Sequence, residues 1–579
     1  MIVIADRFRI GLCFRRCLKP FVCSVALVSL SACGGGDGVS STTESDLSAF
    51  LPDGVDRCEF FGQYNDRVCD ADCPLPDPDC DSGDIRNIDS EGPTMCLAVR
   101  GNGDRIPAHF AGLARLYEQH GLFSGVAGGS SAALTALMIE GVQKNPSVRC
   151  STCSAEQMGE RAALLMKSIR GYMDTVFSSE DVLAAQSFVS LLASIEEQGL
   201  DVALENGSPS ATEDFETLLN SDRFRSLINP EIFQLLRQSP DPDFHALDIY
   251  RGIQATVTFD ASDPNILVRP GLLNVDGLAE QFGRAADFYV DTDFDQFLSS
   301  CSDRSVGKDW STIQNLPIAS GGTCGSEYFE PLSEYLQFRT ESTQLQRPVG
   351  EFMHTLIPTS LLEGQAVSDW RDAFEAYKQA QPVNPQFNYS DIRFGYFGHR
   401  QDLQRVLENR NNYTDEKTNR FRAIDNVTWA DVLRYSPAEP GLSRALVLPD
   451  GRVSAGGWSD LHPVQSLKNM GCDKVIYLTR QGEESRFARG VSQLLGMQPD
   501  DDTALFDLSQ TNSGFSQALD LADGVWCTNW DQQEQLNFDA FFADAYSAPF
   551  QTTDPALMLN GYENTRSFLG VKGCSAGVF

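Results

Sequence analysis

The residues best suited to chemistry lie in the segment GVAGGSSAALTALM, residues 125–138. A serine hydroxyl becomes a useful nucleophile on a tight turn between a strand and a helix, where the helix N-terminus favours developing negative charge. Such a turn has no room for side chains two positions to either side of the serine. Gly128 and Ala132 occupy those positions around Ser130, which predicts a nucleophile at Ser130. A serine-rich helix N-cap, with small residues for close packing, explains the same segment.

A glycine-bearing loop, GNGDR at residues 101–105, follows the apolar strand that precedes this segment. Main-chain amides at such a position can stabilise the oxyanion formed in acyl transfer. We therefore predict an oxyanion hole at Gly101, Asn102 and Gly103. A dinucleotide-binding GxGxxG loop fits less well, because Ile106 stands where that motif requires a glycine.

The loop and the serine turn together resemble the patatin-like phospholipases, over roughly residues 93–141 and 430–480. The resemblance implies a three-layer α/β/α fold and hydrolysis of fatty-acyl esters of phospholipids or lysophospholipids through a serine acyl-enzyme, without a cofactor. Three positions depart from the family pattern. Asn102 and Ile106 replace usual glycines, and Ala132 replaces the last glycine of GxSxG.

The family's catalytic aspartate precedes two glycines in a late loop, but this chain has Ala455 at that position. Three hypotheses follow. Asp460, in the same loop, supplies the base; or His462 supplies it, in a Ser-His-Asp arrangement; or hydrolysis is lost and the domain is a surface binding or scaffolding protein. We prefer Asp460. Asp450, in a predicted hairpin turn, and Asp276 are weaker candidates.

The pattern of elements predicts a main domain over 93–579. Strand, helix, strand and helix alternate from 94 to 142 with short links, which is typical of a parallel α/β layer. Helical periodicity predicts insertions over about 147–250 and 301–420. Strands are predicted between them at 252–260, 265–275 and 287–294, and later at 445–457 and 473–480.

The N-terminal residues predict export and a lipid anchor. Residues 1–32 combine basic residues with a short apolar stretch, as in a signal peptide. The sequence LSAC that ends at Cys33 resembles a bacterial lipobox, which implies acylation of Cys33 and, with Gly34 following it, the outer membrane. Residues 33–56 are predicted to be a flexible tether. The expected partners are thus membrane lipid, through acylated Cys33, and a lipid substrate.

Charge and cysteine content bound the other partners. The net charge of -35 makes nucleic acid an unfavourable partner. The chain has 16 cysteines, and export favours disulfides over redox or zinc chemistry. We predict a two-disulfide module over 57–81, in which clustered aspartates are an alternative calcium site. No catalytic metal is expected. Further pairs are predicted between Cys150 and Cys153, Cys301 and Cys324, and Cys527 and Cys574.

Overall fold

The structure is a computed structural model of a chain that divides into two compact units, Met1–Arg86 and Asn87–Phe579. The residues it describes all belong to the second unit: 93–101, 106–177, 225–226, 228–237, 267–271, 273–292, 342–379, 392–409, 421–439, 443–480, 518–528, 550–552 and 554–557. The signal peptide, Cys33, the tether, the 57–81 module and the strand at 252–260 lie outside these residues. So do Asn102, Gly103, Cys301, Cys324 and Cys574.

The described strands form one ten-stranded sheet in the order β10-β9-β8-β1-β2-β3-β4-β5, with the β6–β7 hairpin joined to β3. The five strands from β9 to β3 in this order run parallel, whereas β4 runs antiparallel to β3. The strand bounds are β1 Met95–Val99, β2 Gly125–Ala127, β3 His354–Leu362, β4 Arg393–Gly398, β5 Phe421–Ile424, β6 Leu446–Val447, β7 Val453–Ser454, β8 Lys474–Arg480, β9 Gly524–Thr528 and β10 Phe550–Thr552.

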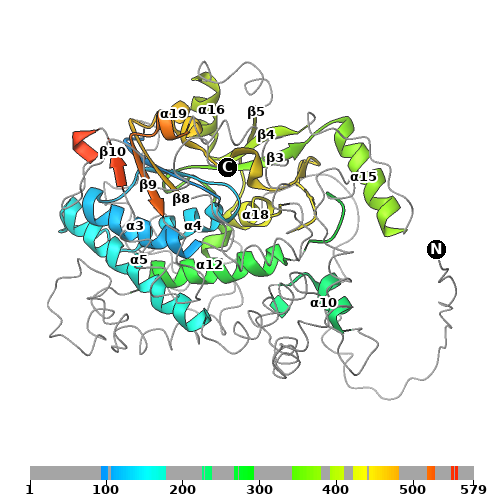
Figure 1. Ribbon diagram of the computed structural model, residues 1–579, viewed down its shortest axis with the longest axis horizontal. Helices are drawn as coiled ribbons and strands as arrows, with labels where there is room; N and C mark the ends of the chain where they lie inside the picture. Colours follow the sequence, from blue (N-terminus) through cyan, green and yellow to red (C-terminus); the bar gives the residue numbers. More distant parts are fainter. Residues whose placement is uncertain are drawn as a thin grey trace, which may run out of the picture. The chain divides into compact units, whose positions relative to one another are not determined.

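Helices cover both faces of this sheet, so the predicted three-layer α/β/α fold is confirmed (Figure 1). Alternate residues of β1 enter opposite cores, with Leu97 and Val99 on one side and Cys96 and Ala98 on the other. The first face carries α3 Ile106–His120, α4 Ser131–Lys144, α5 Ala155–Phe177, α12 Val275–Asp291 and α18 Trp429–Tyr435. The second carries α16 Arg400–Glu408 and α19 Val464–Met470.

Two further helices complete the described part of the chain. Helix α15, Gln365–Lys378, packs Trp370 and its neighbours against the end of β3 and against β7. Helix α10, Pro230–Arg237, is short and is reached by the Arg444 guanidinium, which binds the Glu231 carboxylate. None of the described helices combines the length and apolar character needed to cross a membrane.

The order of elements before residue 145 agrees with the prediction from sequence, whereas the middle of the chain differs. The strand predicted at 287–294 is wrong, because residues up to Asp291 continue helix α12. Ala286 and Tyr289 are buried in the core shared with α4, at the three-residue spacing of one helix face. The described part of 265–275 likewise forms turns and a single bridge at Leu273 rather than a strand.

The predicted irregular and helical insertion over 301–420 also needs correction, because it contains β3 and β4. All nine residues of β3 are buried, including Thr355, Thr359 and Ser360. A strand covered on both faces lacks the alternation of apolar and polar residues that marks a half-exposed strand. Its polar residues therefore obscured it in the sequence.

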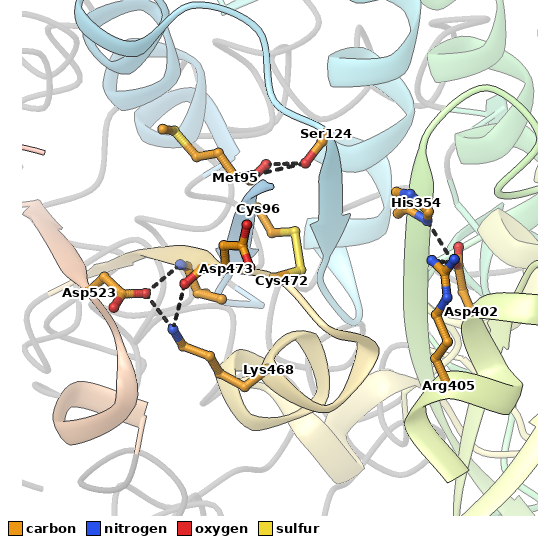
Figure 2. The surroundings of a disulfide bond; sticks show 11 residues. Met95, Cys96, Ser124, His354, Asp402, Arg405, Lys468, Cys472, Asp473 and Asp523 are labelled. Carbon is orange, nitrogen blue, oxygen red and sulfur yellow. Dashed lines mark hydrogen bonds and ion pairs between the residues drawn. A yellow bond between two sulfur atoms is a disulfide. The ribbon is translucent and has the colours of Figure 1, made fainter. Parts of the chain in front are cut away.

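A disulfide between Cys96 and Cys472 joins β1 to the loop that leads into β8 (Figure 2). The sequence did not predict this pair, which is separated by 376 residues. Around it, the Asp523 carboxylate accepts hydrogen bonds from the Val475 amide and from Lys468. The disulfide thus fixes the central strand pair β1–β8. The predicted pairing of Cys150 with Cys153 is confirmed, and Cys527 is disulfide-bonded.

Replacing both Cys96 and Cys472 by Ala is expected to lower the free energy of unfolding by roughly 2–5 kcal/mol, because the bond closes a very long loop in the unfolded chain. Denaturant unfolding under oxidising conditions measures this change. The matched control is Cys150→Ala with Cys153→Ala, which opens a loop of three residues and should cost clearly less. Equal losses in the two double variants would contradict the expectation.

Candidate active site

Ser130 lies on a sharp turn between β2 and α4. The sequence predicted this strand before Ser130 and this helix after it. Strand β2 ends at Ala127 and helix α4 begins at Ser131. Ser130 is buried and has φ 56° and ψ -129°. Among the described residues, only Ser130 and Asn426 combine a side chain with a positive φ. Such a conformation is strained for any residue other than glycine, and strain of this kind concentrates at functional sites.

A second turn in the same sheet shows what a purely structural residue does in this conformation. Between β3 and α15, Gly364 adopts φ 60° and ψ -128°, nearly the same angles as Ser130. A glycine reaches them without steric cost. The β2–α4 turn instead has a residue with a side chain at these angles, so it bears a strain that the glycine turn avoids.

The small residues around Ser130 are required by close contacts, as the sequence predicted. A Cβ placed on Gly128 would lie 2.6 Å from the Ala132 Cβ and 2.9 Å from the Val99 carbonyl oxygen. On Gly129 it would lie 2.5 Å from the Gly457 carbonyl oxygen. Contacts this short exclude any side chain larger than hydrogen. The turn is therefore as tight as the pattern GxSxA implies.

Ser436, the residue after helix α18, holds the backbone of this turn. Its hydroxyl accepts a hydrogen bond from the Ser130 amide at 3.0 Å and donates one to the Pro358 carbonyl at 2.9 Å. Its own carbonyl accepts from the Gly457 amide at 2.7 Å. One buried residue, through its hydroxyl and its carbonyl, thus ties together the serine turn, β3 and the loop that contains the two late glycines.

The predicted oxyanion loop begins directly beside Ser130. A Cβ placed on Gly101 would lie 3.5 Å from the Ser130 Cβ and 3.1 Å from the Gly129 carbonyl oxygen. The two segments meet because β1 and β2 are adjacent parallel strands whose carboxyl ends share one edge of the sheet. Gly101 thus lies beside Ser130, while Asn102 and Gly103 lie outside the described residues, and the oxyanion hole stays a prediction.

A half-buried carboxylate that the sequence analysis did not single out, Glu439, lies beside the serine turn. Burial raises the pKa of the Glu439 carboxyl to about 7, and the nearby Ser130 side chain opposes this rise. Its Oε1 atom is inaccessible to solvent and has no hydrogen-bond partner among the described residues. A carboxylate in this environment titrates near neutral pH, where it can accept a proton during a reaction.

The two bases predicted from sequence have other partners. Oδ2 of Asp460 accepts hydrogen bonds from the Tyr396 hydroxyl at 2.6 Å and the Ser466 hydroxyl at 2.9 Å. Its Oδ1 accepts from the His462 amide at 3.3 Å. Nδ1 of His462 is hydrogen-bonded to the Tyr477 hydroxyl. These hydrogen bonds join Asp460 and His462 to residues of β4, α19 and β8 rather than to Ser130. The role of either residue as the base stays a prediction.

The remaining acidic candidates lie away from the serine turn. Asp450 sits in the β6–β7 hairpin, as predicted, and pairs with Arg452. Asp276 pairs with Arg434 at the surface. Ala455, at the position where the resemblance places an aspartate, is fully buried in an apolar cluster with Val453 and the residues of α15.

The sequence contained no local signal for Glu439. It belongs to the segment YSPAEP, which mixes polar and apolar residues, and the burial of residues 435–438 is a property of the fold. The proximity to Ser130 had no signal either, because 309 positions of sequence separate the two.

Within the described ranges, no cluster of three or more His, Cys, Asp or Glu side chains is arranged to hold a metal ion. No protein-family model matches the chain, and no curated protein matches it. Among solved structures, the chain is similar to the crystal structure of VipD from Legionella pneumophila, with 11% sequence identity and a TM-score of 0.22. The alignment covers 78% of this chain and 65% of VipD. A TM-score this low carries no argument about the site.

Replacing Ser130 by Gly is expected to give a more stable protein than replacing it by Ala, by about 1–3 kcal/mol. Both variants lack the hydroxyl, so their difference isolates the cost of the positive φ at this position. Thermal or denaturant unfolding measures it. Gly364→Ala is the reciprocal control, since a Cβ there meets no atom within 4 Å and only the backbone conformation opposes it. Equal stability of the two Ser130 variants would contradict the strain.

Replacing Glu439 by Gln is expected to change how stability depends on pH. With an ordinary pKa of 4.5 when unfolded and about 7 when folded, the parent loses stability as pH rises between these values. The variant lacks this loss, so its advantage over the parent should grow across that window by about 3 kcal/mol and then stay constant. Unfolding at several pH values tests this, with Glu408→Gln on the exposed face of α16 as the control. Parallel pH curves for parent and Glu439→Gln would contradict it.

Proposed function

We propose that this protein is a serine acyl hydrolase that cleaves carboxylic esters through an acyl-enzyme on Ser130. The observation that carries the proposal is the strained backbone of Ser130 between β2 and α4. A hydroxyl held in this conformation at the end of a parallel strand, above a helix N-terminus, is arranged for nucleophilic attack.

The chemistry follows from the groups around the hydroxyl. The Ser130 oxygen attacks the ester carbonyl carbon as its proton passes to a base, and the carbonyl oxygen becomes negatively charged. The N-terminus of α4 and the loop that begins at Gly101 favour that charge. Collapse of this intermediate breaks the bond to the leaving alcohol, which takes up the proton. Water then attacks the acyl-enzyme and releases the carboxylic acid.

We further propose lipid esters as the substrate class, by the resemblance to patatin-like phospholipases at both the serine turn and the late glycine loop. The acylated Cys33 expected from the sequence is part of the same proposal, because an anchor in the outer membrane would hold the enzyme beside its substrate. Two or more acyl chains give stable membrane attachment without a spanning helix.

A binding protein without hydrolytic activity is the alternative, and one observation favours it. Ala455 stands where the related enzymes carry their catalytic aspartate, and its surroundings are apolar. The two functions differ in whether the Ser130 hydroxyl is activated, which a covalent probe reports directly.

The purified protein is expected to react with a fluorophosphonate, with the modification located at Ser130 by peptide mass spectrometry. It should also hydrolyse short and long acyl esters of p-nitrophenol and phospholipids in vesicles, and Ser130→Ala should reduce both reactions to background. A protein that neither labels at Ser130 nor releases product above the Ser130→Ala control is the binding protein instead. Preference for phospholipid over soluble esters supports the lipid class.

A further inference from the structure

We infer that Glu439 is the general base that activates Ser130, so that the site is a Ser-Glu dyad assembled from two distant segments. This inference rests on the proposed hydrolytic function and specifies its proton acceptor. The position at which the resemblance implies a catalytic aspartate is Ala455, which cannot accept a proton.

The first argument is proximity. The Ser130 side chain lies close enough to the Glu439 carboxyl to lower its pKa, and the Oε1 atom of Glu439 has no hydrogen-bond partner among the described residues, so this atom can accept the hydroxyl proton. The same segment also supports the nucleophile, because Ser436 accepts the hydrogen bond from the Ser130 amide. The stretch that follows α18 thus fixes the backbone of the serine turn and places a carboxylate beside it.

The second argument is how tightly the carboxylate is placed. Gly456 has φ 88°, and a Cβ there would lie 2.7 Å from the Glu439 Cγ and 2.8 Å from its Cα. The neighbouring Gly457 makes the same kind of contact with the serine turn, since its Cβ would lie 2.4 Å from the Ser130 amide nitrogen. The two consecutive glycines therefore pack against the two members of the dyad. The carboxylate absent from position 455 is supplied by the segment that packs on residue 456.

The third argument is energetic. Burial of a carboxylate without a charged partner is costly, and groups of this kind cluster at functional sites. Burial and Ser130 account for the position of the Glu439 pKa near neutrality. The titratable groups on the loop that follows Gly457 are Asp460 and His462. Asp460 and His462 are engaged with β4, α19 and β8.

The proton balance of the reaction is complete with this one carboxylate. Glu439 takes the hydroxyl proton as the Ser130 oxygen forms its bond to the acyl carbon. It returns that proton to the leaving alcohol when the ester bond breaks. In the second half, Glu439 takes a proton from the attacking water, and the Ser130 oxygen recovers it as the acyl-enzyme bond breaks. Ester and water become acid and alcohol, and the enzyme is unchanged.

The test compares the full-length protein with Glu439→Gln, Glu439→Asp, Glu439→Ala and Asp460→Asn. The measured quantities are the rate of fluorophosphonate labelling at Ser130 and kcat/KM for an acyl ester, each from pH 5 to 9. Glu439→Gln is expected to lower both by about 10²–10⁴-fold. The parent rates should rise with pH through about 7, whereas the residual rates of Glu439→Gln should lack this rise. Glu408→Gln controls for the substitution itself.

Chemical rescue separates catalysis from folding. Glu439→Ala removes the carboxylate and leaves space beside Gly456, so added formate should restore part of its labelling rate, while formate should not accelerate the parent. Glu439→Asp should retain more activity than Glu439→Gln if the charge is what matters. Thermal unfolding of each variant shows that it is folded.

The outcomes distinguish the two proposals. If the parent does not label at Ser130, the hydrolytic function fails. If the parent labels at Ser130 and folded Glu439→Gln labels equally fast with the same pH profile, the hydrolytic function stands and the base assignment is overturned. Loss of labelling in Asp460→Asn with retention in Glu439→Gln overturns it in favour of Asp460. Loss in Glu439→Gln together with rescue of Glu439→Ala by formate supports Glu439.

Discussion

The site depends on the backbone conformation of Ser130. A positive φ at a residue with a side chain is unstable by itself, so the surrounding structure must impose it. It does so by leaving no other space: Gly128 contacts Ala132, Gly129 contacts Gly457, and the Ser436 hydroxyl holds the Ser130 amide. Gly364 has nearly the same backbone angles at another strand-to-helix turn of the same sheet, which shows that the fold can make this turn without strain when the residue is glycine.

A second unfavourable feature lies beside the first. Glu439, beside the same turn, is a half-buried carboxylate whose Oε1 atom is inaccessible to solvent and whose pKa burial raises to about 7. Either feature alone lowers the stability of the folded state, and natural proteins retain such features where activity needs them. Their coincidence at the serine turn is the strongest indication of function among the described residues. It also reconciles the serine turn with the missing aspartate at position 455, because the adjacent Gly456 packs directly on Glu439.

The rest of the fold supplies rigidity to this small region. Segments around residues 101, 130, 358, 436 and 456 meet at one edge of the sheet, although the first and the last are 355 positions apart in the chain. The parallel strands β8, β1, β2 and β3 set their relative positions. The Cys96–Cys472 disulfide joins β1 to the loop before β8, at the amino ends of these two strands. Helix α4, buried along its whole length, fixes the direction of the turn that precedes it.

Local features of the sequence determined the elements from β1 to α4, including the turn at Ser130. The apolar strand before Gly101, the helical spacing of 106–120 and the crowd of small residues around Ser130 each act over a few neighbours, so they predicted β1, α3, β2, the tight turn and α4. Long-range packing decided the remainder. Strand β3 is covered on both faces and contains polar residues, so it lacks the alternating pattern by which a strand is predicted. The final residues of α12 have a strand-like composition, and their helical conformation is decided by packing against α4. The partner of Ser130 could not be read in advance for the same reason: which of several acidic side chains reaches one hydroxyl is set by the sheet order and by the contact between Gly456 and Glu439, and neither is a property of neighbouring residues in the chain.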